Sequence, residues 1–122
     1  MKTKIIAENA PKPAGPYSQA IVSDNRIYVA GQGPLNPVTG ETPATVAEQT
    51  RQVLTNVKNI LEAAGATMND VVKVGAYLAD MKDFAEYNQV YKEFFDEPYP
   101  VRTTVGAQLN NILVEVDVIA EK

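Results

Sequence analysis

Hydrophobic residues near the middle of the chain recur with the period of a helix. From about Thr45 to Ala64 they lie three or four positions apart, which places them on one face of an amphipathic helix. This apolar face consists of Val46, Val53, Leu54, Val57, Ile60, Leu61 and Ala64. Thr45 and Glu48 have the spacing of a capping box, and Gly65 is a natural C-terminal stop. The pattern predicts a helix over residues 45–64 with one buried face.

Before this helix, the apolar pattern is that of short strands. The segment KIIA (4–7) predicts an opening strand, and AIVSDNRIYVAG (20–31) predicts a β-hairpin that turns at Asp24-Asn25. Two segments dense in proline and glycine, 8–19 and 32–43, predict loops because these residues interrupt regular structure.

After the helix, residues 70–81 alternate as a strand does. The two predicted faces of this strand are Val72, Val74, Ala76 and Leu78, all apolar, and Val71, Lys73, Gly75 and Tyr77. A second helix is predicted over residues 82–95, with Asp80 as its N-cap and Pro98 beyond its end. The apolar segments 101–107 and 112–120 are predicted to close the chain as a final hairpin.

This order of elements predicts a single α+β domain over residues 1–122, with a mixed sheet and two helices packed on one of its faces. The other face is too apolar to lie comfortably in water. Residues assigned to it are Val71, Tyr77, Leu113 and Ile119. We therefore expect self-association that buries this face. The alternative is an amphipathic sheet with one half-wet face.

Composition removes several classes of chemistry. The chain has no His, Cys or Trp, so it offers no imidazole base, no thiol nucleophile and no cysteine or histidine metal site. Proton transfer must then use carboxylates, lysine, tyrosine, backbone or water. The formal net charge is −4 and the basic residues are scattered, which argues against a nucleic-acid partner. No apolar run suits a membrane span or a signal peptide, so we expect a cytoplasmic protein.

The segment PYPVRTTVGA (98–107) contains the first candidate for chemistry. Strand alternation places Arg102 and Thr104 on one face. Arginine keeps its charge and presents a planar fork of donors that suits a carboxylate. The small residues around Arg102 leave room for a ligand. The alternative is a solvated edge arginine or an ordinary ion-pair partner.

Two acidic residues form the second candidate. Glu115 and Asp117 lie two positions apart and point to the same face of the last predicted strand. The final hairpin could bring this acidic face beside Arg102. Either a structural ion pair results, or the arginine holds an anionic substrate while a carboxylate handles water or protons.

Three further positions are ambiguous. Asn88 lies on the aromatic stripe of the second predicted helix and either caps a loop or contacts a ligand. Tyr17 either anchors its loop or donates into a pocket. Gly31 precedes Gly33, but the third glycine of a dinucleotide fingerprint is missing, so nucleotide binding is unsupported and a tight turn or close backbone approach is favoured.

Six segments occur in an order that carries a family resemblance: ENAPKPAGPYSQA, YVAGQGPLNPVTGE, VKNILEAAGA, DFAEYNQVYKEFF, PVRTTV and VEVDVIA. Together they resemble the Rid (reactive intermediate deaminase) family, specifically its RidA branch. The resemblance implies a chorismate-mutase-like fold and a homotrimer with sites in clefts between subunits. It also implies hydrolysis of 2-imino and enamine carboxylic acids, such as 2-iminobutanoate and 2-iminopropanoate, to 2-keto acids and ammonia without a metal or organic cofactor.

The same resemblance assigns roles to individual residues. Arg102 matches the arginine that grips the substrate carboxylate, and Glu115 matches the acid that helps to activate water. Tyr17, Asn88 and Gly31 match residues that border the cleft.

The chain also departs from the family pattern. Thr104 stands where many RidA proteins have cysteine, and it remains a candidate because it offers a hydroxyl and a carbonyl. Ala30 stands where serine is frequent, and the 107–112 connection is shorter than usual. Two alternative functions stay open: a trimeric metabolite-sensing or chaperone-like protein that uses the same cleft, and an RNA-cleaving translation inhibitor, against which the acidic chain without histidine argues.

Overall fold

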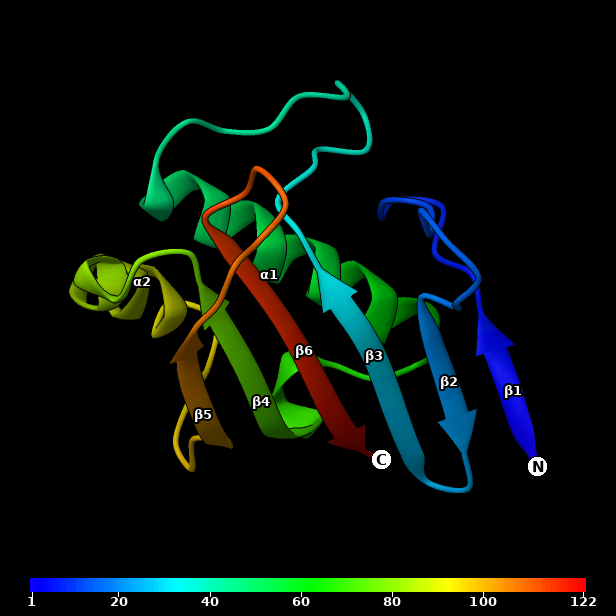
Figure 1. Ribbon diagram of the computed structural model, residues 1–122. Helices are drawn as coiled ribbons and strands as arrows, with labels where there is room; N and C mark the ends of the chain where they lie inside the picture. The colour runs from blue at the N-terminus through cyan, green and yellow to red at the C-terminus, as the bar shows by residue number, and fades with distance from the viewer.

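The computed structural model describes residues 1–122 and shows one mixed sheet with two helices on one face (Figure 1). The strands are β1 (Lys2–Ile5), β2 (Ala20–Ser23), β3 (Arg26–Gln32), β4 (Val71–Leu78), β5 (Val101–Gly106) and β6 (Val114–Glu121). The helices are α1 (Val46–Ala63) and α2 (Phe84–Tyr91), with short 3-10 turns at Met68–Asp70 and Met81–Asp83. Across the sheet the order is β1-β2-β3-β6-β4-β5. The predicted α+β class is confirmed. Neither helix combines the length and the apolar character of a membrane span.

Helix α1 forms where the apolar periodicity predicts it, and both of its ends are fixed by local chemistry. The Thr45 hydroxyl accepts a hydrogen bond from the Glu48 backbone N–H at 3.2 Å and donates one to the Glu48 carboxylate at 3.0 Å. Beyond the helix, Gly65 has a φ of +81°, which glycine adopts without steric cost. The predicted apolar face is buried, and Ala64 packs against the core at its end.

The predicted β2–β3 hairpin is also confirmed. The two strands pair antiparallel up to Ser23 and Arg26, which leaves Asp24 and Asn25 as the connecting residues. Asp24 has a φ of +53°, a left-handed conformation that a short polar side chain tolerates.

The predicted final hairpin is wrong. β5 pairs in parallel with β4, and β6 lies between β3 and β4, antiparallel to both. The burial pattern explains this choice, because every second residue of β6 from Val114 to Ala120 is buried whereas β5 contains no buried residue. A strand with such an apolar face buries the most apolar surface at the centre of the sheet. The less apolar β5 lies at the edge of the sheet. Helix α2 provides the crossover that a parallel β4–β5 pair requires.

Three details also differ from the prediction. The opening strand is observed at Lys2–Ile5 and not at residues 4–7. The β4–β6 register shifts between Val71 and Lys73, so Val71 is buried in the core and Val72 faces outward with 42% of its surface exposed. Strict alternation had assigned these two valines the other way round. The second helix is split, since Asp80 caps the 3-10 turn that precedes α2 and the regular helix ends at Tyr91 instead of Phe95.

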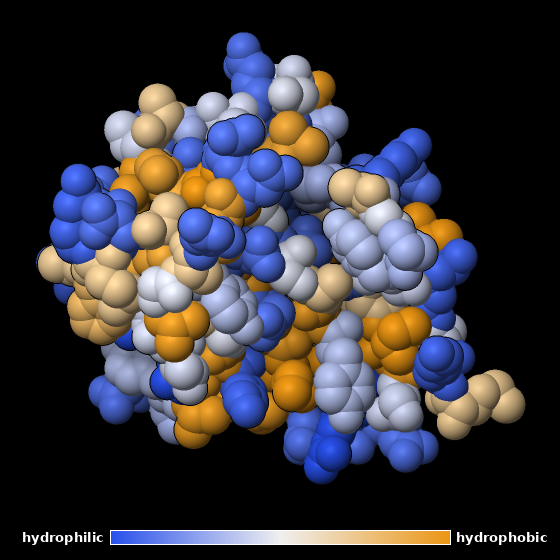
Figure 2. Space-filling view, in the orientation of Figure 1, coloured by the Kyte–Doolittle hydropathy of each residue, from blue (hydrophilic) through white to orange (hydrophobic).

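The sheet face away from the helices is open in this chain. Figure 2 shows apolar atoms across this face, among polar ones. Its exposed apolar side chains include Tyr28, Val72, Val101 and Val105. Of the four residues assigned to it from the sequence, Tyr77 and Ile119 alternate with the buried residues of their strands and so lie on it. Val71 and Leu113 instead pack on the core side, where the Leu113 backbone N–H donates to the Gln49 side chain at 2.8 Å.

Candidate functional site

Arg102 lies on the helix-covered side of the sheet, as the partner of Val74 across the β4–β5 ladder. Its guanidinium carbon lies 4.5 Å from the ring centroid of Tyr91, 5.5 Å from that of Tyr87 and 5.7 Å from that of Phe84. Such stacking favours a planar cation and leaves its N–H edge free for hydrogen bonds.

No carboxylate of the chain neutralises Arg102. The three ion pairs are Arg26–Glu121, Arg51–Glu93 and Lys82–Asp80. An intrachain ion pair between Arg102 and the β6 carboxylates, one of the readings left open by the sequence, therefore does not form.

Four buried polar atoms near this arginine lack hydrogen-bond partners. They are the hydroxyl oxygens of Tyr87, Tyr91 and Thr104 and the side-chain carbonyl oxygen of Asn88. More than about 90% of buried polar groups in proteins are paired, so four unpaired atoms from α2 and β5 are unusual. We call these four residues, together with Arg102, the Arg102 cluster. Its unpaired groups are the kind that a polar ligand or a second chain can satisfy.

The two tyrosines of the cluster are held neutral. Burial raises the pKa of Tyr87 far above its ordinary value and raises the pKa of Tyr91 as well. Arg102 opposes the effect of burial at both residues, through its positive charge and through the approach of its N–H groups to the phenol oxygens, but does not overcome it. This approach falls short of hydrogen-bond geometry, so the two hydroxyl groups remain without a well-formed partner. The phenols therefore present hydroxyl groups, not phenolates, beside the cation.

A cavity of about 410 Å³ opens next to the Arg102 cluster. It is lined by Asn88, Tyr91, Lys92, Tyr99, Pro100 and Arg102. The cavity lies beside Arg102, where the small neighbouring residues were expected to leave room for a ligand. Tyr91 and Lys92 follow Asn88 by three and four residues, which places both next to Asn88 at the end of α2.

Glu115 and Gly31 form a separate group on the open face of the sheet. Adding a Cβ atom to Gly31 would bring it into overlap with the Glu115 carboxylate. The missing side chain at position 31 thus lets the β6 carboxylate lie against the β3 backbone, which is the close approach considered from the sequence.

The expected proximity of Glu115 to Arg102 is wrong within one chain. Val114 and Val116 of β6 are buried under the helices, so Glu115 between them points to the opposite face from Arg102. The expectation failed because it depended on the final hairpin. Asp117 is on the open face too and accepts a hydrogen bond from the Tyr77 hydroxyl at 2.9 Å, which raises the pKa of Tyr77.

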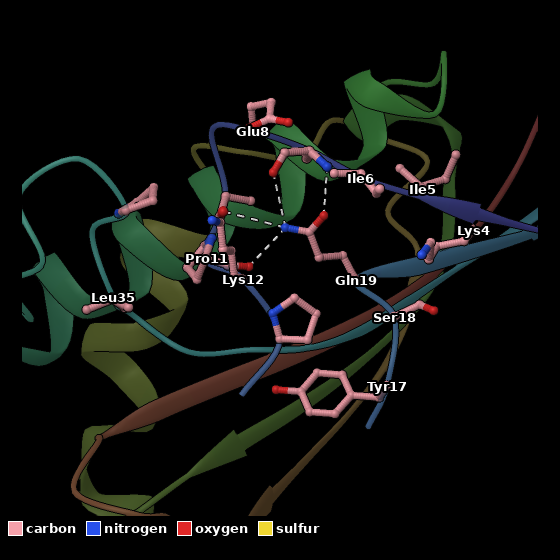
Figure 3. Close-up of a pocket in the computed structure, with 14 residues that line it drawn as sticks. Lys4, Ile5, Ile6, Glu8, Pro11, Lys12, Tyr17, Ser18, Gln19 and Leu35 are labelled. Carbon is pink, nitrogen blue, oxygen red and sulfur yellow. Dashed lines mark hydrogen bonds between the residues drawn. The ribbon is translucent and has the colours of Figure 1, made fainter. Parts of the chain in front are cut away.

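Tyr17 lies in the loop before β2, with 52% of its surface exposed. Its hydroxyl accepts a hydrogen bond from the Ala14 backbone N–H at 3.2 Å. Tyr17 borders a cavity of about 510 Å³ between β1 and this loop (Figure 3). That cavity contains none of the other predicted site residues.

Gln19, which the sequence did not single out, holds this loop in place (Figure 3). Its side-chain oxygen accepts from the Ala7 N–H at 2.7 Å, and its side-chain nitrogen donates to the Ala7 carbonyl at 3.1 Å and the Pro11 carbonyl at 2.9 Å. The side chain is buried, with 4% of the residue exposed. A glutamine next to a short apolar strand gives no sequence signal of this role.

The structure thus brings together Arg102, Thr104 and Asn88 on one side of the sheet, and Glu115 and Gly31 on the other. Sequence reasoning missed the cluster tyrosines and Lys92. The spacing of Asn88 and Tyr91 on one helix face could have indicated Tyr91, but nothing local links the other two residues to Arg102.

Comparisons with known proteins agree with this architecture. A family model described as endoribonuclease L-PSP matches residues 7–122. The chain is 52% identical over 125 residues to a RutC family protein of Pyrococcus horikoshii, across 100% of this chain and 99% of that protein. It is 45% identical over 125 residues to the 2-iminobutanoate/2-iminopropanoate deaminase of Escherichia coli K12, across 98% of each.

A solved structure of Escherichia coli TdcF with bound serine has a TM-score of 0.93 to this chain at 38% identity, across 98% of each chain. Sequence and structure therefore match along nearly the whole length, not at one motif. The chain belongs to the endoribonuclease L-PSP family, which includes the Rid proteins that its sequence resembles.

Proposed function

We propose that this protein hydrolyses 2-imino carboxylic acids, including 2-iminobutanoate and 2-iminopropanoate, to 2-keto acids and ammonia. The observation that carries the proposal is the unneutralised Arg102 beside four buried polar atoms without partners. A small carboxylate with further polar groups would satisfy both needs. The 45% identity to a deaminase and the serine bound to TdcF support a ligand of this class.

The site in this proposal is shared between copies of the chain in a homotrimer. Arg102 and Glu115 point to opposite faces of one sheet, so one copy alone cannot place both on one small substrate. The apolar open face supports association, because burying such a face removes apolar surface from water. A ring of three copies would let Arg102 of one chain meet Glu115 of the next.

In the proposed reaction, Arg102 holds the substrate carboxylate through two parallel hydrogen bonds. Protonation of the imine nitrogen makes the imine carbon electrophilic. Glu115 orients a water molecule towards this carbon and accepts a proton from the water. A C–O bond forms to give a carbinolamine, proton transfer converts its nitrogen to an ammonium leaving group, and the C–N bond then breaks. The sum is imine plus water to ketone plus ammonia, with no oxidant or reductant.

The other candidate residues have supporting roles in this proposal. Thr104 and Asn88 contribute the unpaired oxygens next to Arg102 that orient the ligand. Tyr17 lies away from Arg102 within one chain, so in this proposal it comes from a neighbouring copy and steadies the substrate nitrogen or the carbinolamine. Gly31 allows the Glu115 carboxylate to lie against β3. Proximity and one proton acceptor provide the modest acceleration that so reactive a substrate requires.

Two other functions were left open by the sequence, a metabolite sensor and an RNA-cleaving protein. A metabolite sensor needs Arg102 but not Glu115, so Glu115→Gln would leave ligand binding and the sensing response intact. Cleavage of RNA, which the family description names, has little support in a chain with net charge −4 and no histidine.

The test is the release of 2-ketobutyrate from 2-iminobutanoate, made in place by a threonine dehydratase with semicarbazide as the competing trap. We expect the wild type to accelerate release and Arg102→Ala to abolish the acceleration. Arg26→Ala, which removes an exposed arginine at the start of β3 that does not line the cavity, is the matched control and should act as the wild type does. No acceleration by an assembled wild-type protein would refute the proposal, and retained ligand binding would then favour the sensor.

A further inference from the structure

Within one chain, the cavity beside Arg102 contains two cations and no carboxylate. Lys92 and Arg102 both line it, and its four other lining residues are uncharged. Neither cation takes part in any of the three ion pairs of the chain.

The nearest acid in the sequence does not neutralise Lys92. Glu93 is paired with Arg51 of α1, with its two carboxylate oxygens 3.2 and 3.3 Å from one guanidinium nitrogen. Lys92 is exposed, and its flexible stem lets the ammonium group approach a ligand at the cavity mouth.

The volume of the cavity leaves room for a substrate longer than 2-iminobutanoate. Pockets of about 300–1,000 Å³ accommodate ligands of drug size. Within one chain the cavity measures about 410 Å³, which is more than the carboxylate and short alkyl chain of 2-iminobutanoate require, and the neighbouring copy that brings Glu115 to Arg102 would close part of it. A longer substrate could keep one carboxylate on Arg102 and extend its side chain towards Lys92.

We propose that the cavity selects 2-imino acids that carry a second carboxylate at the end of the side chain, with Lys92 as the specificity residue. This inference rests on the proposed function and names its preferred substrate class. The carboxylate next to the imine binds Arg102, and the distal carboxylate binds the Lys92 ammonium.

The reaction on such a substrate is the same hydrolysis. For 2-iminosuccinate, water adds to the imine carbon, the C–N bond breaks, and oxaloacetate and ammonia leave with both carboxylates unchanged. Since two-electron oxidation of an amino dicarboxylic acid yields such an imine, an amino-acid oxidase or dehydrogenase reaction would supply it.

Binding of stable product analogues tests the selection directly. By calorimetry at low salt, the assembled wild type should bind 2-oxoglutarate more tightly than 2-ketobutyrate, by about fivefold, the upper range for an exposed ion pair. Lys92→Met should reduce the affinity ratio to near one. Lys58→Met removes an exposed lysine of α1 outside the cavity and should keep the wild-type ratio.

The inference would be overturned by a wild type with no preference for 2-oxoglutarate, or by a preference that survives in Lys92→Met. Raising the salt concentration should weaken the preference, since salt screens an exposed charge pair. A preference unaffected by salt would also contradict the role of Lys92.

Turnover separates this inference from the proposed function. Release of 2-keto acid is compared for 2-iminobutanoate and for 2-iminosuccinate made in place by an L-aspartate oxidase. If neither imine is consumed faster than without protein, the proposed hydrolysis fails, whatever the binding shows. If 2-iminobutanoate is hydrolysed and 2-iminosuccinate is not favoured, the hydrolysis stands and the selection by Lys92 fails.

Discussion

At the scale of single residues, the candidate site combines charges and hydroxyl groups that the chain itself leaves unsatisfied. Arg102 is stacked on Tyr91, with ring and guanidinium carbon 4.5 Å apart, but has no counter-ion. Burying unpaired polar groups costs about 1–3 kcal/mol each, so their persistence in one place indicates a use. On the other side of the sheet, Gly31 keeps the space that the Glu115 carboxylate occupies.

The buried phenol of Tyr87 predicts how stability depends on high pH. Its pKa is raised in the folded protein, so its ionisation favours the unfolded chain above the ordinary tyrosine pKa of about 10. The stabilising contribution is complete below pH 10 and is lost as the pH rises further. Tyr87→Phe should therefore make the decline of unfolding free energy above pH 10 shallower, by up to about 1.4 kcal/mol per pH unit.

Urea unfolding at fixed protein concentration over pH 9–11 measures this slope. Tyr99→Phe, at an exposed position, controls for loss of a phenol hydroxyl. An unchanged slope in Tyr87→Phe would mean that Tyr87 does not retain its proton in the folded protein.

At the scale of elements, the sequence correctly predicted the features that depend on residues close together in the chain. The Thr45 cap, the apolar face of α1 and the Asp24-Asn25 turn each act within a few residues, and all three are observed. Strand pairing is different, because the placement of β6 between β3 and β4 depends on which distant strands need a buried neighbour. The same limit applies to the site. Strand alternation correctly placed Arg102 on the same face as Thr104, but the position of Arg102 relative to Glu115 can be predicted only when the order of the strands is known.

The loop that carries Tyr17 gives a prediction at this scale. Gln19 satisfies backbone groups of Ala7 and Pro11 that would otherwise be buried without partners. Gln19→Met keeps a similar volume but removes these bonds, and we expect a loss of about 1–3 kcal/mol in unfolding free energy together with faster proteolysis in residues 8–16. Gln108→Met, at an exposed position, is the control.

Urea denaturation and limited proteolysis followed by mass spectrometry measure the two effects. Because this loop carries Tyr17, 2-iminobutanoate hydrolysis should also fall in Gln19→Met below the unfolding transition. Unchanged cleavage sites and unchanged stability would show that the loop holds its shape without the glutamine.

At the scale of the whole molecule, the sheet itself separates the two halves of the candidate site. Helices α1 and α2 cover the face that contains Arg102, whereas Glu115 is on the apolar face that no element of the chain covers (Figures 1 and 2). Closing the open face against another copy and completing the site would then be one event. Assembly and activity should accordingly be lost together when the open face is made polar.

Mixing two inactive variants tests this coupling without disturbing the interface. Arg102→Ala and Glu115→Gln should each be inactive alone, yet mixed assemblies formed by joint refolding should hydrolyse 2-iminobutanoate. Suppose that the two variants mix at random, in equal amounts, in a ring of three. About one quarter of the interfaces then join an intact Arg102 to an intact Glu115 of its neighbour. We therefore expect about a quarter of the wild-type activity. A double variant, Arg102→Ala with Glu115→Gln, mixed with wild type controls for assembly. Because a site built from one chain could never be restored by mixing, complete inactivity of correctly assembled mixtures would exclude a shared site.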